Sequence, residues 1–177
     1  MRLFTAIPMT VEIKNNLSAI HRDISGLKWI PFDQLHMTLK FIGRTRLHVA
    51  GELMTALESV EFESFEITVR SLGCFPSKAS PSVLWAGVEA PRSLFDLQSQ
   101  VAEIAEQYGA KHDRFTFKPH VTIARIDSTP GEKIMNLMDE FEDLEAGKMK
   151  VRRFILYKSE LHSGGATYTI KRAYECR

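Results

Sequence analysis

The sequence predicts an α+β fold, one compact unit built from two similar lobes. Strand-like and helix-like segments alternate along the chain, and the second half repeats the order found in the first. A chain of 177 residues suits one domain, whereas either half alone would be only marginally stable. We therefore expect a single domain over residues 1–177. Its lobes should meet near the turn-like residues 77–82, with strands free to exchange between them.

In the first half, four segments are expected to form strands, mostly because apolar and polar residues alternate along them. They are residues 2–7, 27–30, 36–43 and 62–75. Thr10 is a suitable N-cap for a helix that runs to about Ser25 and stops at Gly26. Apolar residues at helical spacing predict a second helix over residues 46–60.

The second half has the same plan. Four segments are expected to be strands: residues 82–89, 120–126, 150–161 and 167–175. Pro91 suits the first turn of a helix whose apolar stripe stops near Gly109. Another helix is expected over residues 129–144, and the glycine-containing segment 162–168 is expected to be a hairpin turn.

Composition narrows the functional class. The formal net charge of +1 argues against a uniformly basic nucleic-acid coat but allows a locally basic pocket. The two cysteines lie far apart and without metal-ligand spacing, so a reduced, cytoplasmic setting is expected. No apolar run is long enough to span a membrane, and the N-terminal segment is a poor signal peptide.

One short pattern occurs twice, as LHMTLKFI over residues 35–42 and as PHVTIARI over residues 119–126. Successive side chains of a strand point to opposite faces, so His36 shares a face with Thr38, and His120 with Thr122. A single histidine on a strand is most often structural or simply exposed. Two with the same flanking residues, in corresponding places of the two halves, favour a shared cleft between the lobes.

Two imidazoles and two hydroxyls suit acid–base chemistry on a phosphodiester. Imidazole titrates near neutral pH, so one histidine can be a base while the other is an acid. Hydroxyl groups bind phosphate oxygens. We expect two macroscopic pKa values on either side of about 6.5. No carboxylate–histidine cluster has metal-ligand spacing, so neither a metal ion nor another cofactor is expected.

The alternation of side chains along a strand also predicts which face the residues after each motif occupy. Lys40 is expected on the face of His36, where its charge would help to bind an anion. Phe41 and Arg125 are expected on the opposite faces. Arg125 would turn toward its histidine only at a β-bulge or a strand end.

These motifs resemble those of the two-histidine (2H) phosphoesterase superfamily, in particular the branch of RNA 2',3'-cyclic phosphodiesterases, also called LigT-like or 2'-5' RNA ligases. The first signature, H-x-T-x-x-F-x-G, is complete from His36 to Gly43, and the second, P-H-x-T-x-x-R, from Pro119 to Arg125. The resemblance extends over nearly the whole chain. It implies two pseudo-symmetric lobes of antiparallel sheet, with outer helices, around a V-shaped cleft.

The resemblance also implies an activity, the hydrolysis of a terminal 2',3'-cyclic phosphate of RNA or a nucleoside to a 2'-phosphate. In that scheme His120 is the proton acceptor, His36 is the proton donor, and Thr38, Thr122 and Arg125 bind the phosphate. The residues alone leave the order of the two histidines open. Ligation of RNA ends through a 2'-5' linkage would be the reverse reaction, and a monomer that binds RNA ends or nucleotides is expected.

Other residues are weaker candidates, since core or surface roles explain them as well. Candidate substrate contacts are Phe4, Lys40 and Tyr157, and Trp29 is a further aromatic candidate for stacking a base. Two alternative functions stay open. One is a 2H enzyme for another diester, such as a 2'-5' oligonucleotide or a cyclic ADP-ribose phosphate, and the other is a non-catalytic RNA-end binding protein.

Overall fold

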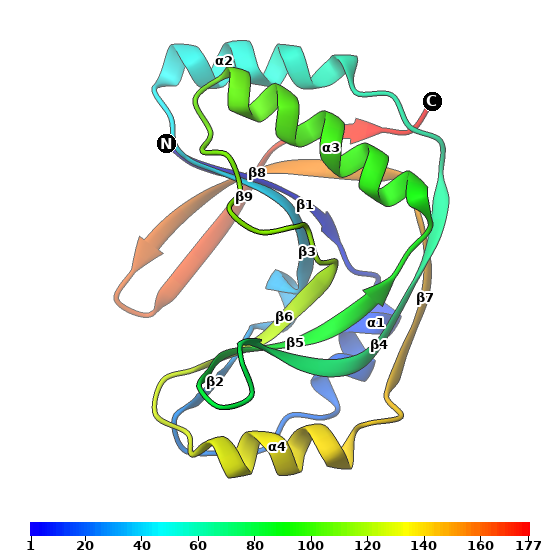
Figure 1. The fold of residues 1–177 in the computed structure, drawn as a ribbon. Coiled ribbons are helices and arrows are strands. Elements are labelled where there is room, and N and C mark those ends of the chain that lie inside the picture. The colour runs from blue at the N-terminus through cyan, green and yellow to red at the C-terminus, as the bar shows by residue number, and fades with distance from the viewer.

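The computed structural model describes all 177 residues as four α-helices and nine β-strands (Figure 1). The strands are β1 (Arg2–Pro8), β2 (Leu27–Trp29), β3 (His36–Arg44), β4 (Phe65–Pro76), β5 (Pro81–Glu89), β6 (His120–Ile126), β7 (Glu145–Val151), β8 (Arg153–His162) and β9 (Gly165–Glu175). The helices are α1 (Val11–Ser18), α2 (Leu47–Ala56), α3 (Arg92–Gln107) and α4 (Gly131–Glu140). The expected α+β class is confirmed.

All strand pairs are antiparallel, and the strands follow the order β7-β4-β5-β6-β3-β1-β8-β9, with β2 paired to β6. The contact between β3 and β6 is narrow, because Met37 and Val121 are its only paired residues. This seam divides the molecule into a first lobe of β3, β1, β8 and β9 and a second lobe of β6, β5, β4, β7 and β2. In Figure 1, α2 and α3 lie outside the first lobe and α4 outside the second.

Each lobe takes strands from both ends of the chain. In the first lobe β1 lies between β3 and the late strand β8, and in the second lobe β4 lies between β5 and β7. The turn near residues 77–82 was expected at the junction of the lobes. It is instead the tip of the hairpin formed by β4 and β5, so both strands beside it belong to the second lobe. One cluster of 38 buried hydrophobic residues runs through both lobes.

The first helix is shorter than its pattern predicts. The Thr10 side chain caps it as expected by accepting a hydrogen bond from the backbone N–H of Ile13, but the helix ends at Ser18 rather than near Ser25. The following residues form turns that are held by Trp29, whose indole N–H donates to the Arg22 carbonyl oxygen at 2.8 Å. Trp29 therefore supports this turn and does not lie at the motif histidines.

The segment 150–161, expected as one strand, belongs to two strands separated at Arg152. The earlier one, β7, begins at Glu145 and pairs with β4. Its sequence gives little sign of a strand, because only Ala146 and Val151 are buried along it. Helix α4 is likewise shorter than the expected 129–144 and ends at Glu140.

Candidate active site

The two motif strands carry the same irregularity. Thr5 of β1 pairs with Lys40 of β3, but the next residue, Ala6, pairs with Thr38. Leu39 is therefore the extra residue of a β-bulge. In the same way, Leu84 of β5 pairs with Ala124 of β6 and Trp85 pairs with Thr122, so Ile123 is the extra residue. Each bulge thus follows directly after the threonine of its motif. Since a bulge shifts the alternation by one residue, every side chain after it changes face.

This shift overturns the expectation for Lys40. Instead of sharing the face of His36, Lys40 is 1% exposed and points toward α3. Its ammonium group lies 2.8 Å from Glu106 and 2.8 Å from Asp113, and it donates to the Lys111 carbonyl oxygen at 2.9 Å. Burial acts to lower the pKa of Lys40, but the hydrogen bonds that its ammonium group donates to these two carboxylates, together with their charges, outweigh burial and raise the pKa. Lys40 therefore anchors the segment after α3 and cannot contact a ligand at His36.

The same shift moves Phe41 and Arg125 onto the histidine faces of their strands. Phe41 was expected to be packed with Met37, yet it is 66% exposed, and its ring centre lies 6.1 Å from that of Phe4. Arg125 was expected to need a bulge in order to turn toward His120, and the bulge at Ile123 supplies it. Arg125 is exposed on the face that carries His120 and Thr122.

Both histidines are held in one orientation by the backbone two residues upstream. The Nδ1–H of His36 donates to the Gln34 carbonyl oxygen at 2.6 Å, and that of His120 donates to the Lys118 carbonyl oxygen at 2.6 Å. A carbonyl oxygen can only accept, so Nδ1 carries the proton in each ring. When either ring is neutral, Nε2 has the free electron pair and is the atom that can exchange a proton.

The surroundings of Nε2 differ between the two rings. The hydroxyl of Thr38 lies 3.1 Å from His36 Nε2 and can donate to it. Burial lowers the pKa of His36, and the charges of Lys14 and of a protonated His120 lower it further, against the opposing hydrogen bond to Gln34. Burial also lowers the pKa of His120. The structure thus corrects the expectation of pKa values on either side of about 6.5, because both are lowered in the free protein.

Aromatic rings pack around both histidines. Phe4 and Tyr157 stack with their ring centres 5.2 Å apart, and the Phe4 ring centre lies 5.1 Å from that of His36. Tyr168 completes this group, with its ring nearly perpendicular to that of His36 and the two ring centres 5.5 Å apart. Phe4 is 3% exposed, so it supports His36 rather than offering an open stacking face.

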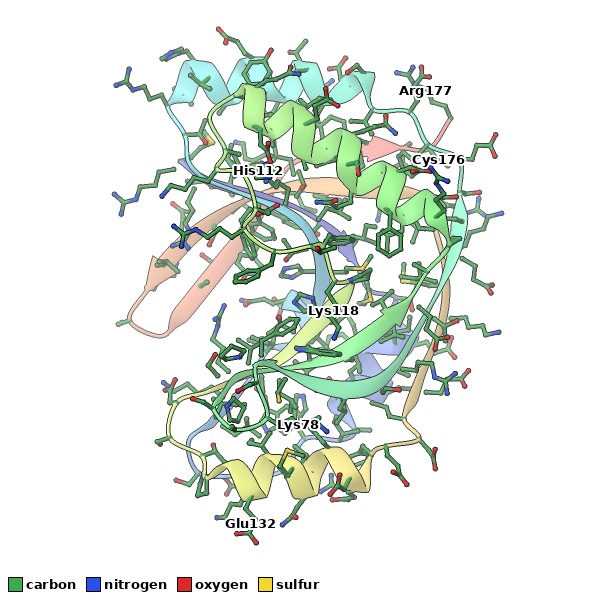
Figure 2. The ribbon with its side chains drawn as sticks, in the orientation of Figure 1. Lys78, His112, Lys118, Glu132, Cys176 and Arg177 are labelled. Atoms are coloured by element: carbon green, nitrogen blue, oxygen red, sulfur yellow. The ribbon has the colours of Figure 1, made fainter.

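His120 has a different set of neighbours, none of which the sequence singled out. The ring centre of Phe75 lies 5.0 Å from that of His120, and the Trp85 ring centre lies at 6.1 Å. The ammonium group of Lys118 lies 4.7 Å from the Trp85 ring centre, and Figure 2 shows Lys118 between the two lobes. The structure also explains a glycine inside the expected strand 62–75: Gly73 lies opposite Trp85, and any Cβ there would overlap the indole ring.

Two cavities are prominent. One of about 400 Å³ borders His36 and is lined by residues of β1, α1, β8 and β9. A larger one of about 820 Å³ lies between α3 and residues 112–117 and includes neither motif histidine. His112 lines that larger cavity beside α3 and contacts Glu106 (Figure 2). No group of three or more His, Cys, Asp or Glu side chains is placed to hold a metal ion. No helix is both long and apolar enough to cross a membrane.

Comparison with known families identifies the family of this chain. The model of the 2'-5' RNA ligase superfamily matches residues 12–162. Several proteins named RNA 2',3'-cyclic phosphodiesterase are similar over most of their length. The one from Archaeoglobus fulgidus is 30% identical over 99% of this chain and 100% of its own. The one from Thermotoga maritima is 31% identical over 100% of this chain and 95% of its own.

Solved structures agree in fold. Protein TT0787 of Thermus thermophilus superimposes with a TM-score of 0.83 at 25% identity, over 100% of this chain and 98% of its own. The apo form of LigT from E. coli superimposes with a TM-score of 0.79 at 25% identity, over 99% of this chain and 96% of its own. Both similarities extend across the two lobes.

Proposed function

Because this chain belongs to the 2'-5' RNA ligase superfamily, the family expected from its two motifs, we propose that it is an RNA 2',3'-cyclic phosphodiesterase. It hydrolyses the terminal 2',3'-cyclic phosphate of RNA to a 2'-phosphate, without a metal ion. The observation that carries this proposal is the matched pair of histidines on β3 and β6, each held through Nδ1 so that Nε2 is the atom that can exchange a proton. The pair supplies one base and one acid, which the reaction needs.

The proposed reaction is an in-line displacement at phosphorus. Nε2 of neutral His120 takes a proton from water as the water oxygen forms a bond to phosphorus. The bond from phosphorus to the 3' oxygen breaks on the opposite side, and Nε2–H of protonated His36 gives its proton to that oxygen. A 2'-phosphate and a 3' hydroxyl result, and the next cycle begins when the two rings exchange their protons with solvent.

Three further side chains would bind the phosphate. Thr38 and Thr122 lie on the same faces as their histidines, and their hydroxyls can donate to the non-bridging oxygens. Arg125, turned by the bulge in β6, would add a charge-assisted bond. A bound phosphate anion should also raise the pKa of both histidines, which keeps His36 protonated in the complex.

A substrate panel tests the proposal. We expect the purified protein, in the presence of EDTA, to convert nucleoside and oligoribonucleotide 2',3'-cyclic phosphates to 2'-phosphates, with product position assigned by ³¹P NMR. A 2'-5'-linked oligonucleotide serves as the comparison substrate. Turnover of that diester alone, or a requirement for a divalent ion after EDTA treatment, would contradict the proposal.

The state of the protein in the cell is part of the same proposal. We infer a cytoplasmic monomer, consistent with two cysteines, Cys74 and Cys176, that form no disulfide. Sedimentation at micromolar concentration should give a mass close to the 20.2 kDa of one chain. A dimeric mass would overturn this part without affecting the proposed chemistry.

A further inference from the structure

We infer that the cavity beside His36 binds the 5'-phosphate group of the nucleotide whose cyclic phosphate is hydrolysed, through Lys14 and Arg153. The ligand class is a phosphate ester on the 5' oxygen, as in an RNA chain end, rather than a free nucleoside cyclic phosphate. The inference rests on the proposed function, in particular on His36 as the acid.

The position of the cavity follows the path of the substrate. Its volume is about 400 Å³, and its lining includes His36 but not His120. In the proposed in-line reaction the water enters from His120 and the 3' oxygen leaves toward His36. The ribose that carries this oxygen therefore lies on the His36 side. Its 5' oxygen, and the chain attached to it, would then extend away from His120, and this cavity lies on the His36 side, with residues of β1, α1, β8 and β9 in its lining.

The charges on the cavity wall suit a phosphate. Lys14 of α1 and Arg153 of β8 both line it, and they come from opposite ends of the chain. Lys14 has no ion-pair partner, and the nearest carboxylate to Arg153 is Glu175, at the long distance of 3.9 Å. Asp33 is the only acidic residue in the lining. Two cations whose charges are barely neutralised are thus available for charge-assisted bonds to one anion.

Electrostatic effects on neighbouring rings agree with this placement. Besides burial, which is the larger cause, the charge of Lys14 lowers the pKa of His36. Burial raises the pKa of Tyr157, and the charge of Arg153 opposes that rise. Each cation therefore acts on a ring beside the same cavity, one at His36 and one at the stacked tyrosine.

The test compares two substrates that differ by one phosphate, adenosine 2',3'-cyclic phosphate with and without a 5'-phosphate. In the unaltered protein we expect kcat/KM to be at least about tenfold higher for the 5'-phosphorylated substrate, which is the gain that one or two charge-assisted hydrogen bonds would give. In the double variant Lys14→Gln, Arg153→Gln this ratio should fall to about one. Profiles are measured across pH, since loss of Lys14 also raises the pKa of His36.

A matched control is Lys133→Gln, which removes one charge from an exposed position on α4 in the other lobe. This variant should keep the full ratio. A ratio near one in the unaltered protein, or a ratio that survives the double substitution, would overturn the inference.

A binding measurement separates this inference from the proposed function. By isothermal titration, adenosine 2',5'-bisphosphate should bind about tenfold or more tightly than adenosine 2'-phosphate, and the double variant should lose this difference. Equal affinity in the unaltered protein would overturn the 5'-phosphate site even if hydrolysis is observed. The predicted difference in affinity without any turnover would support the site and count against the proposed reaction alone.

Discussion

Strands β3 and β6 have the same motif and the same bulge, yet the two sites they form are not equivalent. After the bulge, β3 presents Phe41 on the histidine face, whereas β6 presents Arg125 at the corresponding position. On the opposite face the corresponding residues are Lys40, which is 1% exposed, and Ala124, which is fully buried. The backbone therefore sets which positions face the cleft, and the side chains there set the role of each lobe.

In the proposed reaction, this difference would give the two lobes separate tasks. His36 lies beside Tyr157 and Tyr168, which are partly exposed and form a surface suited to a ribose and base. His120 lies near the cation Lys118, and Arg125 is exposed further along the same face of β6, a surface suited to the phosphate. One lobe would thus hold the nucleoside and the other would neutralise the charge at phosphorus.

The largest effect is expected from replacing the motif histidines, which both lobes have. His36→Ala and His120→Ala should each lower kcat about 10²–10⁴-fold, the usual contribution of a positioned acid or base. Single-turnover assays on a cyclic-phosphate substrate would measure this. Circular dichroism and Tm should change little, because each ring makes only one backbone hydrogen bond of its own. Near-full activity in either variant would refute the paired mechanism.

The next largest effect is expected from replacing Arg125, the residue after the bulge in β6 that corresponds to Phe41 in β3. Arg125→Ala should lower kcat/KM about 10–100-fold, since it removes a charge-assisted bond to the phosphate. Arg125→Lys should restore part of it because the charge is retained. At the corresponding position in the other lobe, Phe41→Leu should change kcat/KM by less than about threefold. Equal losses at both positions would mean that the two lobes do not divide their tasks in this way.

A smaller effect, on thermal stability, is expected from replacing Lys40 on the buried face of β3. Lys40→Met should lower Tm by about 3–8 °C, because it removes the partner of Glu106, of Asp113 and of a backbone carbonyl. The loss is limited because both carboxylates remain partly exposed to water. Differential scanning calorimetry measures the change, with Lys133→Met as a surface control that should keep the original Tm. An unchanged Tm for Lys40→Met would show that this buried cluster adds no net stability.

The smallest effect is a displacement of the pH profile. Below its pKa the proposed base, His120, is protonated, and above its pKa the proposed acid, His36, is neutral, so kcat/KM should follow a bell. Since burial lowers both pKa values in the free protein, the bell should be centred below about 6.5. The kcat profile should lie at higher pH, because a bound phosphate raises both pKa values. A kcat/KM profile centred above 6.5, or one that is flat from pH 5 to 9, would contradict this assignment.

The motifs could be predicted from the sequence because they depend on local alternation. His36 and Thr38 share a face in any strand, and the order of strands and helices follows from the same kind of pattern. The bulges could not be predicted. The run from Leu39 to Ile42 alternates as if Lys40 were outside and Phe41 inside, and only the pairing of β3 with β1 reverses this.

Long-range pairing also explains the neighbours that the sequence did not reveal. Tyr168, Phe75 and Trp85 reach the histidines from strands far away in the chain. No local pattern near His36 or His120 points to them. The position of β7 was missed for a similar reason, because its place in the sheet depends on pairing with β4 rather than on a strong pattern of its own.

The position of β1 between β3 and β8 has a consequence for synthesis on the ribosome. β1 can pair with β3 early, but its other edge stays open until the chain has been extended through His162, the end of β8. Pairs so distant in the sequence slow folding, since a long loop must close before they form. An open strand edge can also pair with another chain. Completion of the first lobe is therefore the late step of folding, when a growing chain is most exposed to aggregation.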